Sequence, residues 1–467
     1  MATLDVRSAE TPVAAPAPAQ ALVSYRTLVV FLIPLLFTGM MMTFDSPVVN
    51  GALTRLPDAQ QALAAMVVAL SLAFVYEAPH VSMIEVATAL ATTRQALGLI
   101  RRFYVGLAAV MALLAVAVLA TPLYDALVPG LMGIPAAVAT EVRGTLVVFL
   151  FWPVPIGWRR LHQGALIRFG HSRAVGAGAT IRVVTLVVSL AALLVAFTGR
   201  LPGSTIGTLA MLISVTAEAA YTDVAARRLL AGLPDADPSD SARRALTLRA
   251  LWDVFWPLAG TAIINTLNRP LLSAGIAAVA VAAAGAGAEE PALAAWGVAW
   301  GLAVLLYGPT LTLSQVSIAW EKDPRPGMTE RGARVILGIG LLLAGALAGI
   351  AFTPLAGWLL GEVYVVTPAL AAVAQPVMQI VVPVPLLMAA SALVRGRLIA
   401  RGRPRAVRTA QIVDLLVLAA VLTLGLTWPL PLPRPGGALV AALGMLAVGV
   451  SDLSVLAWRL RSVKRDA

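Results

Sequence analysis

The second half of this 467-residue sequence repeats the first half. The clearest match aligns residues 164–175 with 396–407, which share two glycines, the pair Leu-Ile and a closing Arg-Ala-Val. Two shorter motifs also recur, Thr-Pro-Leu at 121–123 and 353–355 and Pro-Val-Pro at 153–155 and 383–385. The matched segments are apolar and long enough to cross a bilayer. Duplicated membrane halves are typical of transporters whose substrate site lies between the halves.

Composition places the chain in a membrane. Hydrophobic residues make up 60% of it and charged residues 12%, whereas a soluble domain carries about 25% charged residues. The apolar segments are too long for barrel strands, so the spans are expected to be helical. Because the chain has no cysteine, disulfides and thiolate metal sites are excluded. The net charge of +11 does not indicate nucleic-acid binding, because the basic residues fall at the membrane edges.

Windows of about 20 apolar residues predict twelve spans. They lie at 27–50, 62–91, 103–125, 137–158, 174–198, 204–226, 251–276, 293–320, 333–359, 368–393, 406–429 and 437–459. Nearly all basic residues follow the even-numbered spans, so the positive-inside rule places both termini in the cytoplasm. We therefore predict an all-α integral membrane protein with two parallel six-helix lobes. The scarcity of lysine beside arginine suggests a bacterial genome, and hence the inner membrane.

The same reading gives domain boundaries. A disordered tail is expected over 1–24, an N-lobe over 25–228, a cytoplasmic linker over 229–250, a C-lobe over 251–460 and a short tail over 461–467. We expect a monomer that contacts the lipid bilayer and a small-molecule substrate.

The sequence lacks the motifs of several classes of enzyme and metal site. The sequence has no Walker-type phosphate loop, no histidine spacing that fits zinc and no paired Asp-rich motif of a prenyl transferase. We therefore expect no enzyme activity, no cofactor and no metal site.

Polar residues inside spans 1 and 7 occupy matched positions. Asp45 aligns with Asn268, and Ser46 aligns with Arg269. Asn265, Asn268 and Arg269 share one face of span 7 by their i, i+3, i+4 spacing. Charged residues in spans are costly and therefore suggest function. The two polar stripes are expected to face each other across a central cleft.

Each stripe also contains a proline, Pro47 or Pro270. Proline removes a backbone hydrogen bond and bends or unwinds a helix, so both positions are predicted hinges. A purely structural alternative is an Asp45–Arg269 ion pair that ties the halves together.

Further ionisable residues lie in other spans. Glu77 and Glu85 occupy span 2, and buried carboxylates take up protons readily, although a hydrated vestibule explains them equally well. Glu218 aligns with Asp452, and Arg182 aligns with Asp414. These four are candidates for ion pairs within the lobes. Arg143, near the external end of span 4, either reaches the surface or attracts an anion.

The chain resembles a known superfamily, the multidrug/oligosaccharide-lipid/polysaccharide exporters that include the MATE transporters. More closely, it resembles the progressive ankylosis protein family. The segments that carry this resemblance are Phe44–Ala52, Asn268–Pro270, Pro79 with Ser82, Arg143-Gly144, Gly164–Val175, Val384-Pro385, Arg395-Gly396 and Gly449–Asp452. They run in order across nearly the whole chain.

The resemblance implies alternating-access export of small multi-charged anions such as pyrophosphate, nucleotides or citrate-like carboxylates. Candidate substrate-binding residues are Arg269, Asn265, Asn268, Arg143, Asn50 and Ser46, and candidate proton-coupling residues are Asp45, Glu77, Glu85 and Glu218. The alternatives are a MATE-like exporter of cationic drugs, a flippase for a lipid-linked saccharide, and a membrane scaffold that transports nothing.

Overall fold

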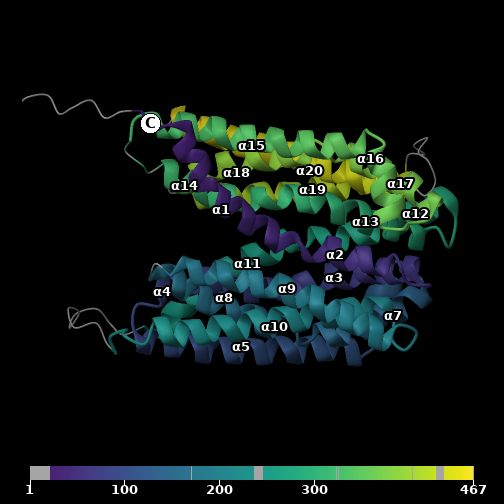
Figure 1. The fold of residues 1–467 in the computed structure, drawn as a ribbon, viewed down its shortest axis with the longest axis horizontal. Helices are drawn as coiled ribbons and strands as arrows, with labels where there is room; N and C mark the ends of the chain where they lie inside the picture. Colours follow the sequence, from purple (N-terminus) through teal and green to yellow (C-terminus); the bar gives the residue numbers. More distant parts are fainter. Residues whose placement is uncertain are drawn as a thin grey trace, which may run out of the picture.

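The protein forms two stacked helical lobes (Figure 1). The computed structural model describes residues 22–169, 171–235, 246–321, 323, 325–401, 403–427 and 436–465. Most of the predicted tail 1–24, the middle of the predicted linker 229–250 and the last two residues lie outside this part. The lobe boundaries predicted from the sequence therefore stay a prediction.

The lower lobe in Figure 1 contains the helices from α2 to α10. These are α2 Asp45–Leu53, α3 Ala59–Val81, α4 Met83–Leu90, α5 Arg94–Ala120, α6 Leu123–Asp125, η1 Ala126–Leu131, α7 Ala136–Phe149, α8 Pro153–Arg168, α9 Ser172–Phe197 and α10 Gly203–Leu229. We call this unit the N-lobe.

The upper lobe, here called the C-lobe, contains the helices from α12 to α20. These are α12 Asn268–Ala284, α13 Glu289–Tyr307, η2 Gly308–Thr312, α14 Leu313–Glu321, α15 Met328–Ala351, α16 Leu355–Trp358, η3 Leu359–Val363, α17 Pro368–Ile380, α18 Val384–Ala400, α19 Pro404–Thr427 and α20 Gly437–Arg465.

Among the described residues, ten helices are long and apolar enough to cross a membrane, or eleven if α7 and α8 form one bent span. The remaining predicted span, 27–50, consists of α1 Tyr25–Thr43 and α2. The fold is an integral membrane helical bundle, as predicted.

The Thr-Pro-Leu motif produces the same local structure in both lobes. The Thr121 hydroxyl donates to the carbonyl of Ala117 at 2.7 Å, and the Thr353 hydroxyl donates to that of Gly349 at 2.6 Å. Each hydroxyl thereby satisfies a carbonyl in the last turn of a long helix. A short α-helix and a π-helical segment follow in each lobe, α6 and η1 or α16 and η3. The sequence repeat therefore produces the same threonine hydrogen bond in both lobes.

Spans 1 and 7 break where their prolines predict. α1 ends at Thr43 and α2 begins at Asp45, while α11 (Leu248–Thr266) ends one residue before Leu267 and α12 follows. Each proline is the third residue of the second segment, where it cannot donate to the carbonyl four residues earlier. Asp45 and Asn268 therefore each begin a helix.

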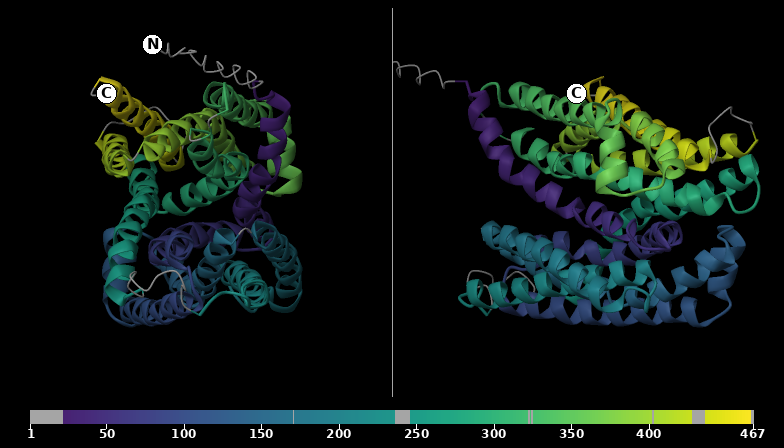
Figure 2. Two further views of the ribbon diagram at one scale, coloured as in Figure 1. Left: turned by 90° about the vertical axis from the view of Figure 1, so that its left-hand side faces the viewer. Right: turned by 45° about the vertical axis from the view of Figure 1, so that its right-hand side comes forward.

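The first halves of these two spans cross to the opposite lobe. Leu28 and Leu32 of α1 pack in a C-lobe core with Trp320, and Phe255 and Ala259 of α11 pack in an N-lobe core. Figure 2 shows α1, in purple, running from one lobe towards the other. Each lobe is therefore completed by a helix from the other half of the chain.

The two ends of the molecule differ. We call the end that holds the start of α1 and the end of α20 the terminal end, and the opposite one the distal end (Figure 1). Towards the distal end, Leu53 and Leu63 share one continuous core with Leu293 of the other lobe. Towards the terminal end, the lobes have separate cores. The lobes are therefore closed against each other at the distal end.

Candidate functional site

The break in span 1 places Asp45 inside the N-lobe. Asp45 is buried, and its carboxylate forms an ion pair with Arg182 of α9. The structural alternative of an Asp45–Arg269 pair is therefore wrong. The helix turns Asp45 into its own lobe, where Arg182 neutralises it.

Arg269 lies between the two lobes. Its guanidinium stacks on the ring of Phe74 of α3, with the guanidinium carbon 4.0 Å from the ring centroid. Its charge also acts on Glu77 of α3 and on Tyr307 of α13. In the described part of the chain it forms no ion pair. A half-buried guanidinium that extends from one lobe to the other and has no ion-pair partner among the described residues is suited to binding an anion.

The neighbouring span 7 amides differ in their environment. Asn265 is exposed, whereas Asn268 is half-buried, and its side-chain oxygen is buried without a hydrogen-bond partner among the described residues. Asn268, Arg269 and Pro270 form the first turn of α12. The free backbone N–H groups of a helix N-terminus favour anions. These residues therefore bring side-chain and backbone donors to one place.

Glu77 lies one turn from Phe74 and is buried. Arg160, Arg159, Arg182 and Arg269 are the cations whose fields act on it. Its Oε2 has no hydrogen-bond partner among the described residues. Glu77 is thus a buried carboxylate in a strongly positive environment.

Two of those arginines, Arg159 and Arg160, were not expected from the sequence to lie within a membrane span. The sequence predicted that span 4 ends at 158, but α8 continues to Arg168, because nothing in its sequence breaks the helix. Arg159 is buried and pairs with Glu218, and Gln163 donates to the same carboxylate at 3.1 Å. Glu218 is therefore fully neutralised. The helical spacing of Arg159 and Gln163 is the signal that would have revealed this.

The C-lobe has its own ion pair. Arg395, which the sequence placed in a loop after span 10, lies on α18 and donates to Asp452 of α20 at 3.0 Å. Asp414 of α19 is half-buried. Asp452 and Arg395 are its charged neighbours. The predicted ion pairing within lobes is thus found for Glu218, Asp452 and Arg182, each with a partner outside the four predicted residues. No ion pair of Asp414 occurs among the described residues.

Other candidate residues lie away from the central region. Arg143 pairs with Asp125 at 2.9 Å, and this pair is largely exposed. Glu85 is exposed on α4, and Ser46 is half-buried in the first turn of α2. These placements leave their predicted roles in binding and coupling as hypotheses.

Asn50 belongs to the closed distal contact between the lobes. Its amide donates to the carbonyl of Gly297 on α13 at 2.7 Å. Nearby, the Tyr364 hydroxyl donates to the carbonyl of Pro47 at 3.0 Å. Gln60 and Glu290 add a third cross-lobe hydrogen bond of 2.9 Å. In this conformation Asn50 holds the lobes together.

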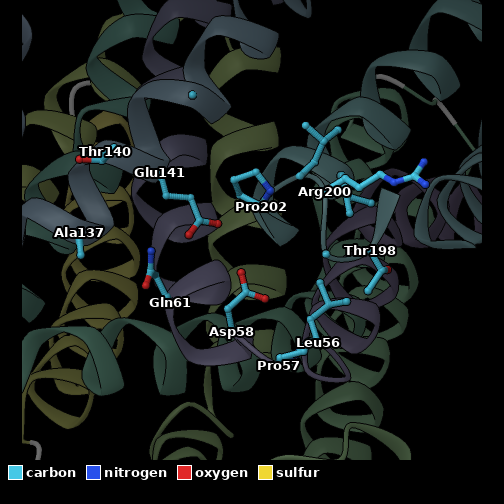
Figure 3. A pocket seen from close by; sticks show the side chains of 14 residues that line it. Leu56, Pro57, Asp58, Gln61, Ala137, Thr140, Glu141, Thr198, Arg200 and Pro202 are labelled. Atoms are coloured by element: carbon cyan, nitrogen blue, oxygen red, sulfur yellow. The ribbon is translucent and has the colours of Figure 1, made fainter. Parts of the chain in front are cut away.

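A cavity of about 570 Å³ lies elsewhere, within the N-lobe (Figure 3). Three polar side chains point into it: Asp58 from the turn before α3, Gln61 from α3 and Glu141 from α7. The loop that carries Arg200 lies along one side. Ser204 donates to Glu141 at 2.5 Å. The cavity is separate from the Arg269 region. No cluster of three potential metal ligands occurs in the described part of the chain.

The fold is similar to solved transporters. An inward-facing multidrug resistance MATE family transporter of the MOP superfamily has a TM-score of 0.69 at 13% identity, covering 93% of this chain and 99% of that one. An outward-facing form of such a transporter has a TM-score of 0.62 at 14% identity, covering 94% and 96%. The two forms together support alternating-access transport by this fold.

A third similar structure is a MOP superfamily transporter from Pyrococcus furiosus, described by a reverse polarity of its binding pocket that suggests a different function. It has a TM-score of 0.64 at 14% identity and covers 94% of this chain and 96% of that one. No curated protein matches the sequence significantly. The family model of the progressive ankylosis protein matches residues 17–336. The chain therefore belongs to the progressive ankylosis protein family and has the fold of the MATE transporters.

Proposed function

We propose that this protein exports a small multi-charged anion, such as pyrophosphate, a nucleotide or a citrate-like carboxylate, across a bacterial inner membrane. The observation that carries the proposal is the position of Arg269. Arg269 belongs to α12 of the C-lobe, its guanidinium stacks on Phe74 of the N-lobe, and it forms no ion pair among the described residues. A substrate carboxylate or phosphate would supply the missing negative charge.

The rest of the site follows from the first turn of α12. Asn268 and the free backbone N–H groups there donate hydrogen bonds to the anion beside Arg269. Asn265 lies one turn earlier and is exposed, so it contacts the anion as the anion enters the site. Because the residues sit at a break in span 7, a movement of α12 against α11 changes the geometry of the site directly.

The proposed direction of transport is outward. The basic residues of the terminal end favour a cytoplasmic position for that end by the positive-inside rule, and the lobes are closed at the distal end. This arrangement is inward-facing and gives an anion access to Arg269 from the cytoplasm, as the first step of export requires. Rocking of the lobes must then break the Asn50–Gly297 and Tyr364–Pro47 hydrogen bonds to open the distal side.

Proton coupling is assigned to Glu77. Each of these carboxylates, Asp45 and Glu77, keeps one oxygen without a hydrogen bond among the described residues, but Asp45 has Arg182 as its ion-pair partner, whereas Glu77 forms no ion pair among the described residues. Protonation of Glu77 changes the charge close to Arg269 and so alters the affinity for the anion. Asp45 and Glu218 then have a structural role.

The flippase alternative requires a lateral gap between spans 1 and 8. Here the two spans are in close contact, since a Cβ on Gly39 would lie 2.8 Å from the carbonyl oxygen of Gly308. This close backbone contact favours a small soluble substrate. The cationic-drug alternative depends on Glu77, whose free oxygen also suits a cation.

The test compares cells that express the parent protein with cells that express Arg269→Ala, Arg269→Lys or Arg102→Ala. Pyrophosphate, nucleotides and di- and tricarboxylates are quantified in the medium. We expect one anion to accumulate with the parent and the control Arg102→Ala, because Arg102 is exposed on α5. Accumulation should fall about tenfold or more with Arg269→Ala, since a hydrogen bond to a charged group contributes about 1.5–3 kcal/mol, and partly recover with Arg269→Lys.

A different outcome would overturn the proposal. If no anion accumulates and tolerance to cationic dyes rises in a way that Glu77→Gln abolishes, the protein exports cations. Accumulation that is unchanged in Arg269→Ala places the anion site elsewhere.

A further inference from the structure

The C-lobe contains a buried charge imbalance that the N-lobe does not have. Asp414 and Asp452 neighbour each other, and Arg395 is the only cation in contact with them among the described residues. Asp452 is 5% exposed. Two carboxylates and one guanidinium leave one negative charge uncompensated inside a membrane lobe, which is unfavourable without a further cation.

Several side-chain oxygen atoms on the three helices that carry this group, α18, α19 and α20, lack partners. Asp414 Oδ1, Asp452 Oδ1, Gln411 Oε1 and Ser391 Oγ are all buried and have no hydrogen-bond partner among the described residues. Ser391 is 2% exposed and lies one turn before Arg395 on α18. Buried polar groups in proteins are normally satisfied by a partner, a water molecule or an ion. Unpartnered oxygens beside an uncompensated charge indicate a cation.

The repeat shows what fills the equivalent place in the N-lobe. By the alignment of Gly164 with Gly396, Arg159 corresponds to Ser391 and Gln163 to Arg395. Arg159 neutralises Glu218, the counterpart of Asp452. In the C-lobe the small Ser391 takes the place of that arginine, so its volume is missing, and Arg395 supplies the positive charge to Asp452 from one turn further along α18. The second carboxylate, Asp414, then has no cation of its own, because it takes the place of Arg182 in the alignment.

We propose that the C-lobe binds one monovalent cation, a proton or a sodium ion, at Asp414 and Asp452. Ser451 of α20 is hydrogen-bonded to Asp414 through its side chain. Its oxygen and those of Ser391 and Gln411 complete the site when the ion is sodium, because hard cations prefer oxygen ligands. The site lies on α18, α19 and α20, away from Arg269, and no substrate is needed for its occupancy. Its use in coupling rests on the transport function proposed above.

The other charged groups near these helices do not neutralise the pair. Arg459 lies two turns beyond Asp452 and stacks on Trp458. The only charged residue of α12, Arg269, lies over Phe74 of the N-lobe. Arg249 and Asp253 of α11 are exposed. The imbalance is therefore local to Asp414, Asp452 and Arg395.

The test measures thermal unfolding of the purified full-length protein, without substrate. Unfolding is compared in sodium chloride and in choline chloride at equal ionic strength, and then at pH 6 and pH 8. A bound cation should raise the midpoint by about 2–5 °C. A rise with sodium at constant pH identifies sodium, and a rise only at low pH identifies a proton.

Two variants link the response to the site. Asp414→Asn removes the excess negative charge, and Ser391→Arg introduces the arginine that the N-lobe has. Each should abolish the sodium response, or the part of the pH response that belongs to this site. Glu330→Gln, an exposed residue of α15, should behave like the parent. The proposal is overturned if both variants respond to sodium and to pH as the parent does, or if the parent responds to neither. Loss of anion export in Arg269→Ala would not affect this result, so the two proposals fail independently.

Discussion

The two lobes share an arrangement of helices but differ in their buried charged residues. In the N-lobe, Arg159, Arg160 and Arg182 lie among the carboxylates Asp45, Glu77 and Glu218, so that positive and negative charges are equal in number. In the C-lobe, Arg395 faces both Asp414 and Asp452. After duplication, the breaks and turns were retained while the buried charges diverged. The lobes can therefore perform different tasks within one symmetric frame.

The largest expected difference concerns the ion pair at the centre of each lobe. Glu218→Gln leaves Arg159 buried without a counter-charge and should cost about 3–5 kcal/mol of unfolding free energy. Asp452→Asn should cost less than half as much, because Asp414 remains beside Arg395. Denaturant titration of both purified variants measures the difference. Equal losses would mean that the C-lobe carries no charge imbalance.

The Asp45–Arg182 pair tests whether the N-lobe balance is structural. Each of Asp45→Leu and Arg182→Met should destabilise the protein strongly, because each leaves one buried charge unpaired. The double variant should recover a coupling energy of about 0.5–3 kcal/mol. Unfolding free energies of the four proteins complete the cycle, and additive losses would argue that the two residues do not interact.

A third experiment transfers part of the C-lobe arrangement to the N-lobe. Arg159→Ser alone removes the partner of Glu218, whereas Arg159→Ser with Gln163→Arg places the guanidinium where Arg395 stands in the other lobe. The second substitution should restore about 1–2 kcal/mol, the contribution of one hydrogen bond to a charged group. Thermal unfolding of the single and double variants gives the comparison. No recovery would indicate that positions 163 and 395 are not equivalent.

The smallest effect is expected for Arg143. It has no counterpart in the C-lobe, since α17 contains no arginine, and its pair with Asp125 is exposed. Exposed ion pairs contribute about 0–1 kcal/mol, so Arg143→Ala should unfold within that range of the parent. A larger loss of stability, or a loss of anion export, would give Arg143 a role that its position does not suggest.

Much of the fold was predictable from the sequence. Apolar windows gave the spans, and Pro47 and Pro270 gave the breaks, because proline acts through the local backbone. The partners of the buried charges were not predictable in the same way. The order of the spans does not tell whether Asp45 meets Arg269 or Arg182, and only the rotation of α2 and α9 in the folded lobe selects Arg182.

Sequence windows also failed to show that Arg159 and Arg395 lie on helices and pair with buried carboxylates. Composition places an arginine at the end of an apolar window in a loop, yet a helix extends as long as its backbone hydrogen bonds can form. α8 and α18 both continue past the predicted ends of their spans. Arginines near a predicted membrane edge need to be considered with the helical face that they share.

The crossing of α1 and α11 has a consequence for biosynthesis. A nascent chain that has been made as far as Leu229 contains every N-lobe helix but lacks Phe255 and Ala259, which belong to its terminal-end core. Domains usually fold as units during synthesis, the N-terminal one first. Here the terminal-end core of the N-lobe stays incomplete until α11 has been inserted into the membrane. Helix α1 likewise lacks its packing partners until the C-lobe helices have been made. Neither half should be stable when expressed alone, whereas the two halves made together as separate chains should assemble.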